Sequence, residues 1–78
     1  MKTTAITLST NPTFVTEDVA YIQAIGGEFL FVFSEKKPTN LNPKEAHLDT
    51  KVYVDGKLGK LWAWKKYSWK TKLIVSSS

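Results

Sequence analysis

Alternating apolar and polar positions dominate the chain and predict β-strands. Residues 4–9 alternate in this way, which indicates a strand that is buried on one face. The other segments are rich in β-branched and aromatic residues and cover residues 19–25, 28–34, 52–54, 60–65 and 70–75. Turn residues separate them, and no amphipathic helix of useful length is predicted. The pattern predicts an all-β fold of about six strands, as a small β-sandwich or a jelly-roll-like barrel.

Two glycine-containing dipeptides predict tight turns between these strands. Gly26-Gly27 separates the strands at 19–25 and 28–34, and Asp55-Gly56 follows the strand at 52–54, with a loop that extends as far as Gly59. Two-residue hairpin turns of type I′ or II′ need positive φ, which glycine adopts without steric cost. We therefore expect a hairpin at each dipeptide, with at least one of Gly26 and Gly27 at positive φ.

The strand at residues 28–34 is apolar on both faces. Phe29, Phe31 and Phe33 point one way, and Leu30 and Val32 point the other. Such a strand is either central to the core of the monomer or covered by a neighbouring subunit. A chain of this length has little material with which to cover two faces, so the three phenylalanines are also candidates for a self-association interface.

The length and the absence of cysteine limit how this chain is stabilised. Its 78 residues are expected to form one domain over residues 1–78, with a flexible tail at residues 76–78. No disulfide can form without cysteine, and a single histidine disfavours a structural zinc site. Self-association or binding to a larger partner is the remaining route to added stability.

The longest irregular stretch covers residues 35–50. It contains two prolines, and residues 42–46 could begin a short helical turn with Asn42 as its N-cap. Loops of this length often carry function or bind partners. His47 is expected to be a loop or edge residue with a local hydrogen bond.

No enzyme chemistry is predicted from the sequence. His47 is the only histidine, no nucleophile elbow accompanies it, and Gly26-Gly27 lacks the rest of a phosphate-binding motif. We therefore expect no catalytic, cofactor or metal-binding residues. No apolar run approaches the roughly 20 residues that span a bilayer, and the N-terminus does not resemble a signal peptide, so we expect no membrane partner and no secretion.

Lysines and aromatic residues are interleaved in the last third of the chain. The net charge is +4, all eleven basic residues are lysines, and residues 57–72 contain no acid. Aromatic rings and lysines together could bind single-stranded nucleic acid or a carbohydrate, whereas the rings could equally be core or interface residues. The absence of arginine disfavours nucleic acid. The alternative ligand surface would comprise Lys60, Trp62, Trp64, Lys65, Lys66, Tyr67, Trp69 and Lys70, and the interface alternative includes Trp62, Trp64 and Trp69.

A series of short motifs runs along nearly the whole chain. They are Asn11-Pro12-Thr13, Ala20-Tyr21-Ile22-Gln23, Gly26-Gly27, Pro38-Thr39, Ala46-His47-Leu48, Leu61-Trp62-Ala63 and Leu73-Ile74-Val75. In this order they resemble small β-rich structural proteins of tailed bacteriophages. The lysine-rich second half, with Trp64 and Trp69 beside Trp62, departs from that pattern and leaves a different binding surface open.

The resemblance implies a non-enzymatic component of a virion. Such a protein decorates the head, forms the base of a head fibre or associates with the tail. The resemblance also implies a homotrimer that binds a capsid or tail protein, made in the host cytoplasm and located in the virion.

Overall fold

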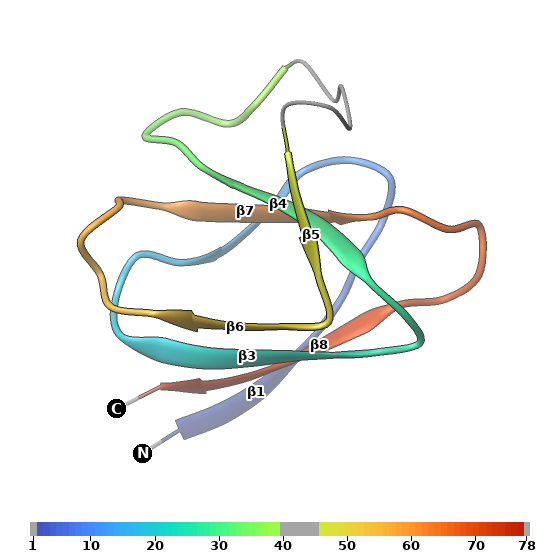
Figure 1. The fold of residues 1–78 in the computed structure, drawn as a ribbon, viewed down its shortest axis with the longest axis horizontal. Helices are drawn as coiled ribbons and strands as arrows, with labels where there is room; N and C mark the ends of the chain where they lie inside the picture. Colours follow the sequence, from blue (N-terminus) through green and yellow to red (C-terminus); the bar gives the residue numbers. More distant parts are fainter. Residues whose placement is uncertain (1, 40–45, 78) are drawn as a thin grey trace.

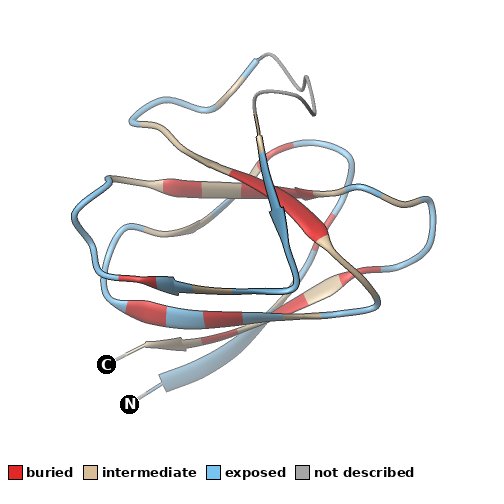
Figure 2. Ribbon diagram, in the orientation of Figure 1, coloured by how far each residue is buried: buried red, intermediate tan, exposed pale blue. Residues whose placement is uncertain are grey.

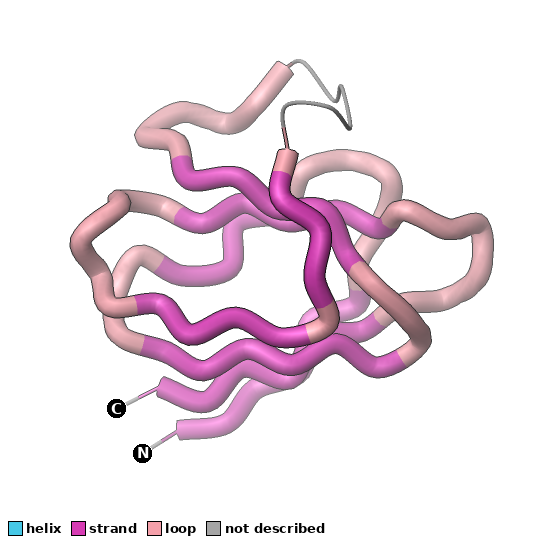
Figure 3. The backbone as a smooth tube through the Cα atoms, viewed as in Figure 1, coloured by secondary structure: helices cyan, strands magenta, loops and turns pink. Residues whose placement is uncertain are grey.

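Two four-stranded antiparallel sheets form the fold in the computed structural model, which describes residues 2–39 and 46–77 (Figure 1). Sheet A contains, in spatial order, β1 (Lys2–Thr7), β8 (Lys72–Ser77), β3 (Ala20–Ile25) and β6 (Lys51–Val54). Sheet B contains β2 (Thr13–Thr16), β7 (Leu61–Lys65), β4 (Phe29–Phe33) and β5 (His47–Asp49). The described ranges contain strands, turns and loops but no helix, and therefore none that could cross a membrane (Figure 3). The expected all-β, sandwich-like fold is confirmed.

Two of the eight strands lie in segments for which no strand is predicted from the sequence. β2 follows the turn at Pro12, and β5 falls inside the predicted loop at residues 35–50. Both are short edge strands, and each is held by one neighbour, β7 for β2 and β4 for β5. Pairing with a central strand stabilises both of them, so they form without a strong strand pattern in their own residues. The predicted helical turn at residues 42–46 lies almost entirely outside the described residues.

The hairpin predictions at the two glycine dipeptides are wrong. β3 lies in sheet A and β4 in sheet B, so Gly26-Gly27 leads the chain from one sheet to the other. Asp55-Gly56 likewise lies in the connection from β6 to β7, which crosses between the sheets. The expected backbone conformation is present, however, with φ of 107° at Gly26 and 126° at Gly27. Positive φ allows a sharp change of direction, but it does not decide which strands pair.

The hydrophobic core lies between the two sheets (Figure 2). Ile22 and Leu73 contribute from sheet A and Phe29 and Leu61 from sheet B, all with no exposed surface. Phe31 belongs to the same cluster, and Phe33 packs against it. The expected interface role of these three phenylalanines is therefore not supported, because their side of β4 is covered by the chain's own sheet A.

Backbone hydrogen bonds extend the pairing of each sheet beyond the strand ends, at the points where the chain passes from one sheet to the other. On one side of the sandwich, Thr50 links β5 to β6, and its carbonyl accepts a bond of 2.7 Å from the Ala24 amide. On the other side, the Leu8 amide donates to Thr71 in front of β8, and the carbonyl of Ser9 accepts from Lys65 on β7. The chain therefore passes between the sheets as bent extended segments, which gives the sandwich a partly barrel-like closure.

The C-terminal residues are paired within sheet A. Ser76 and Ser77, which were expected in a flexible tail, belong to β8 and pair with β1 on one side and β3 on the other. Ser78 lies outside the described residues. Pairing on both sides explains why a run of serines continues a strand despite its weak β-propensity.

Candidate interaction surfaces

The face of sheet B that points away from the core is apolar across all four strands. Register pairs place Phe14 opposite Trp62, Trp62 opposite Val32, and Trp64 opposite Leu30. Leu48 on β5 completes the row opposite Leu30. Directly opposed residues of antiparallel strands share a face. We call these six residues the sheet B outer face: Phe14, Leu30, Val32, Leu48, Trp62 and Trp64.

The centre of the sheet B outer face is covered, and its borders are exposed. Trp64 is 3% exposed and Leu30 5%, although neither belongs to the core cluster between the sheets. Phe14 and Leu48, at opposite sides of the face, are 43% and 39% exposed. Val32 and Trp62 are half-buried. Phe14 and the half-buried Trp62 and Val32 are therefore neighbouring apolar residues with exposed surface, and Leu48 is exposed separately at the other border. Neighbouring apolar residues with exposed surface are characteristic of interaction surfaces.

Two contacts hold Trp62 rigidly on this face. Its ring meets Phe14 edge-to-face, with 5.8 Å between the ring centroids. Its Nε1–H donates a hydrogen bond of 2.8 Å to the carbonyl oxygen of Ser34, just beyond β4. The indole therefore needs no polar partner from outside and presents an apolar edge.

A second aromatic cluster lies at one end of the sandwich, in the connection from β7 to β8. Tyr67 and Trp69 stack with 4.3 Å between centroids and 7° between planes. Tyr67 donates a hydrogen bond of 3.2 Å to Glu28, and Trp69 donates one to the carbonyl of Gly26. The cluster therefore fastens the β7–β8 connection to the β3–β4 connection.

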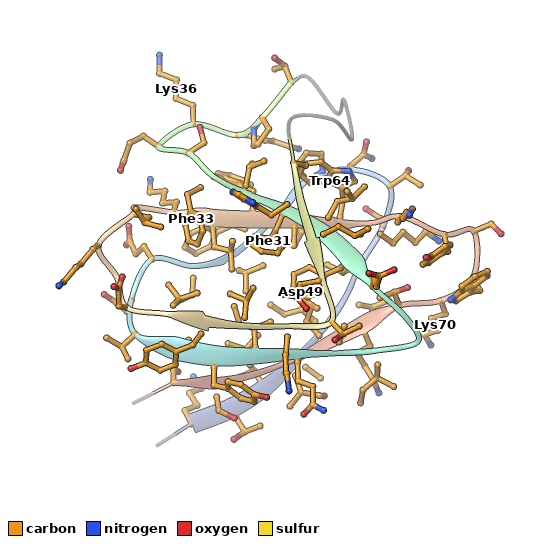
Figure 4. All side chains as sticks on the ribbon, viewed as in Figure 1. Phe31, Phe33, Lys36, Asp49, Trp64 and Lys70 are labelled. Atoms are coloured by element: carbon orange, nitrogen blue, oxygen red, sulfur yellow. The ribbon has the colours of Figure 1, made fainter. Side chains whose placement is uncertain are left out.

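Gly26 and Gly27 provide the room for this cluster. A Cβ at Gly26 would lie 2.5 Å from the carbonyl oxygen of Lys70, and one at Gly27 would contact the rings of Tyr67 and Trp69 at 3.4–3.5 Å. Figure 4 shows Lys70 beside the β3–β4 connection. The sequence shows the glycines and the aromatic residues but not that they meet, because 39 residues separate Glu28 from its partner Tyr67.

The predicted lysine and tryptophan surface is divided between these two places. Trp62 and Trp64 lie on the sheet B outer face, whereas Tyr67 and Trp69 lie at the end of the sandwich. Tyr67 and Trp69 stack directly on each other, so a nucleic-acid base cannot insert between their rings. Trp69 is nevertheless 53% exposed.

The lysines of that surface are dispersed rather than lining one groove. The ammonium group of Lys66 lies 5.3 Å from the centroid of Tyr67, and that of Lys65 donates to the carbonyl of Ser68. Lys70 is exposed on the same connection, and Lys60 precedes β7 at the opposite end of that strand.

The part of the chain that the structure describes encloses no pocket, and it brings together no group of three His, Asp or Glu residues suited to a metal ion. His47 is exposed on β5, an edge strand, and its ring lies 5.3 Å from that of Phe31. Comparisons with protein-family models, curated proteins and solved structures find no match.

Proposed function

We propose that this chain is a non-enzymatic structural protein that binds a larger protein assembly through the sheet B outer face. One observation carries the proposal: the second face of sheet B is apolar on every strand, with Phe14 and Leu48 exposed at its borders. Isolated exposed apolar residues need no explanation, whereas an apolar row with both of its ends exposed points to a binding surface.

The composition and geometry of this face suit a protein partner. Tryptophan is enriched among the residues that dominate binding energies, and both tryptophan and phenylalanine are enriched in protein interfaces. A standard interface buries about 800 Å² on each partner, about one sixth of the 4990 Å² surface of this chain. The exposed part of the sheet B outer face, at Phe14 and Leu48 with Val32 and Trp62 half-buried, would supply the apolar part of such an interface.

The occupant we propose is an apolar surface of a virion protein, in the capsid or the tail. The resemblance of the sequence to small structural proteins of tailed bacteriophages supports this choice. The sheet B outer face contains no charged residue, so its partner surface should be apolar rather than acidic or phosphate-bearing. The lysines, which lie elsewhere, would then serve to keep the remaining surface hydrated.

Co-sedimentation of the purified chain with purified phage heads and tails tests the proposal. Phe14→Lys and Leu48→Lys introduce charges at the exposed borders of the face, where the core is not disturbed. We expect each to weaken particle binding by about tenfold or more, because an unpaired charge would be buried in the interface.

The matched control is Tyr53→Lys, on the outer side of sheet A, where the side chain is 68% exposed. This variant should bind particles as the unmodified chain does. Absence of saturable binding to heads and tails would contradict the proposal, and so would equal binding by all three variants.

A further inference from the structure

β1 differs from the other three strands at the edges of the sheets. β5 contains only three residues, β2 has an irregular register between Phe14 and Thr16, and β6 is four residues long and begins with Lys51. Short length, bulges and lysines are the features that protect sheet edges from pairing with another chain. β1 is six residues long and pairs regularly with β8 over its whole length; like β6, it carries a lysine at its first position only.

The free side of β1 is open to another strand. Among the strands of residues 2–39 and 46–77, β8 is the only neighbour of β1 in sheet A, and every residue of β1 except Ile6 is exposed (Figure 2). The residues after Lys2 are threonine, alanine and isoleucine, a composition that suits a strand. An unprotected edge of this kind is a template for strand addition.

The hydrogen-bond pattern shows which backbone groups face the open side. The Leu8 amide donates to the carbonyl of Thr71, so the backbone groups of Leu8 point to the side on which β8 lies. Successive residues of a strand direct their amide and carbonyl groups to opposite sides. The groups of Thr4 and Ile6 therefore face β8, and those of Thr3, Ala5 and Thr7 face the open edge.

We propose that β1 pairs antiparallel with β1 of a second copy of this chain, with Ala5 on the two-fold axis. In this register Thr3 lies opposite Thr7 of the second copy, and Ala5 lies opposite its own equivalent. Thr3, Ala5 and Thr7, whose backbone groups face the open edge, then exchange hydrogen bonds with the second copy, and sheet A continues across both copies.

Three features of β1 favour a second copy over an unrelated peptide. The register is self-complementary, since it places core-side residues opposite core-side residues, with Thr4 facing Ile6 of the second copy. No lysine faces a lysine, because Lys2 lies opposite Leu8. The side chain on the axis is the small one of Ala5, which allows two copies to approach without a clash.

This self-association is independent of the sheet B outer face, which lies on the other sheet. Phe14→Lys and Leu48→Lys should therefore leave the dimer intact, and the β1 variants should leave the sheet B outer face unchanged. Failure of particle binding and failure of dimerisation can thus be told apart.

Sedimentation equilibrium of the full chain over micromolar to millimolar concentrations tests the pairing. We expect a dimer for the unmodified chain. Ala5→Pro removes the amide that faces the open edge, a change that edge strands tolerate, and should raise the dimer dissociation constant about tenfold or more. Ala5→Val keeps the amide and the strand propensity and should remain dimeric.

Ala5→Lys covers the case in which Ala5→Pro does not fold. It keeps the backbone groups but sets two ammonium groups against each other on the axis, so it should also weaken the dimer. A monomer at all concentrations would overturn the proposal. A trimer would do so too, because two-fold strand pairs cannot close a ring of three. So would a dimer that Ala5→Lys leaves unchanged.

Cysteine cross-linking tests the register itself, since the chain has no native cysteine. Hydrogen-bonded antiparallel neighbours lie about 5.5 Å apart at Cα, within the range of a disulfide. Ala5→Cys should cross-link to itself, and Thr3→Cys should cross-link to Thr7→Cys when the two are mixed. Tyr53→Cys, at a position that is 68% exposed but lies on the opposite edge strand, should react much more slowly. Equal rates for Ala5→Cys and Tyr53→Cys would contradict the proposed register.

Discussion

Replacing Gly26 by alanine tests the contact between the two connections at the end of the sandwich. Gly26 has φ of 107°, and an added Cβ would lie 2.5 Å from the carbonyl oxygen of Lys70. That carbonyl belongs to the backbone and precedes the fully buried Thr71, so it cannot move aside without disturbing β8. Gly56 is the matched control, with φ of 81° but no atom closer than 3.6 Å to the added Cβ.

The two substitutions share one cost and differ in another. Backbone strain at positive φ costs about 1–2 kcal/mol for a residue with a Cβ. Gly56→Ala should therefore lower the free energy of unfolding by about 1–2 kcal/mol. Gly26→Ala also forces the added Cβ against the carbonyl oxygen of Lys70, and overpacking of this kind costs about 1–3 kcal/mol. This substitution should therefore lower the free energy of unfolding by about 2–5 kcal/mol in total.

Urea unfolding at matched protein concentration measures the difference, with far-UV circular dichroism and tryptophan fluorescence as probes. Each kcal/mol should lower the melting temperature by about 4–8 °C in a domain of this size. A Gly26→Ala variant that is unfolded in water while Gly56→Ala is folded also agrees with the reasoning. Equal midpoints for the two variants would refute it, because the Lys70 contact would then cost nothing.

Three further predictions concern the core, a buried hydroxyl and the aromatic cluster. Phe29→Ala should cost about 3–5 kcal/mol of unfolding free energy because the side chain is fully buried, whereas Phe14→Ala, at an exposed site, should cost about 1 kcal/mol or less by urea unfolding. Thr71 is fully buried, and its hydroxyl has no hydrogen-bond partner among the described residues; Thr71→Val should therefore be neutral or stabilising by about 1 kcal/mol in a thermal melt. Titration with a labelled single-stranded oligonucleotide at about 150 mM salt should show at most weak, salt-sensitive binding that Trp69→Ala does not change; sub-micromolar binding that this variant abolishes would instead identify a nucleic-acid site.

The apolar pattern of β4 shows both what sequence reasoning captures and where it stops. Alternation along residues 28–34 correctly separates Phe29 and Phe31 from Leu30 and Val32, because side chains of a strand alternate at every residue. It does not show which of the two faces meets sheet A. That choice depends on volume at the core, where the phenylalanines pack with Ile22 and other residues distant in sequence.

The sheet B outer face is also only partly visible in the sequence. Trp62 and Trp64 stand out as a pair on one side of a strand, and both do lie on this face. Phe14 and Leu48 give no such signal, since they lie in a segment after a proline and in a segment expected to be a loop. They join the face only because their short strands add to β7 and β4.

The all-β class, the approximate positions of the six main strands and the positive φ of Gly26 and Gly27 could all be predicted from the amino-acid sequence. These properties follow from local sterics and from a period of two residues, which neighbouring residues alone can express. The tertiary structure was needed to show that β3 and β4, and likewise β6 and β7, lie in different sheets, that Gly26 meets Lys70, and that β1 is left with an open edge. Those outcomes depend on contacts between residues distant along the chain. The local pattern is compatible with several ways of pairing the strands, and close packing of one small core selects one of them.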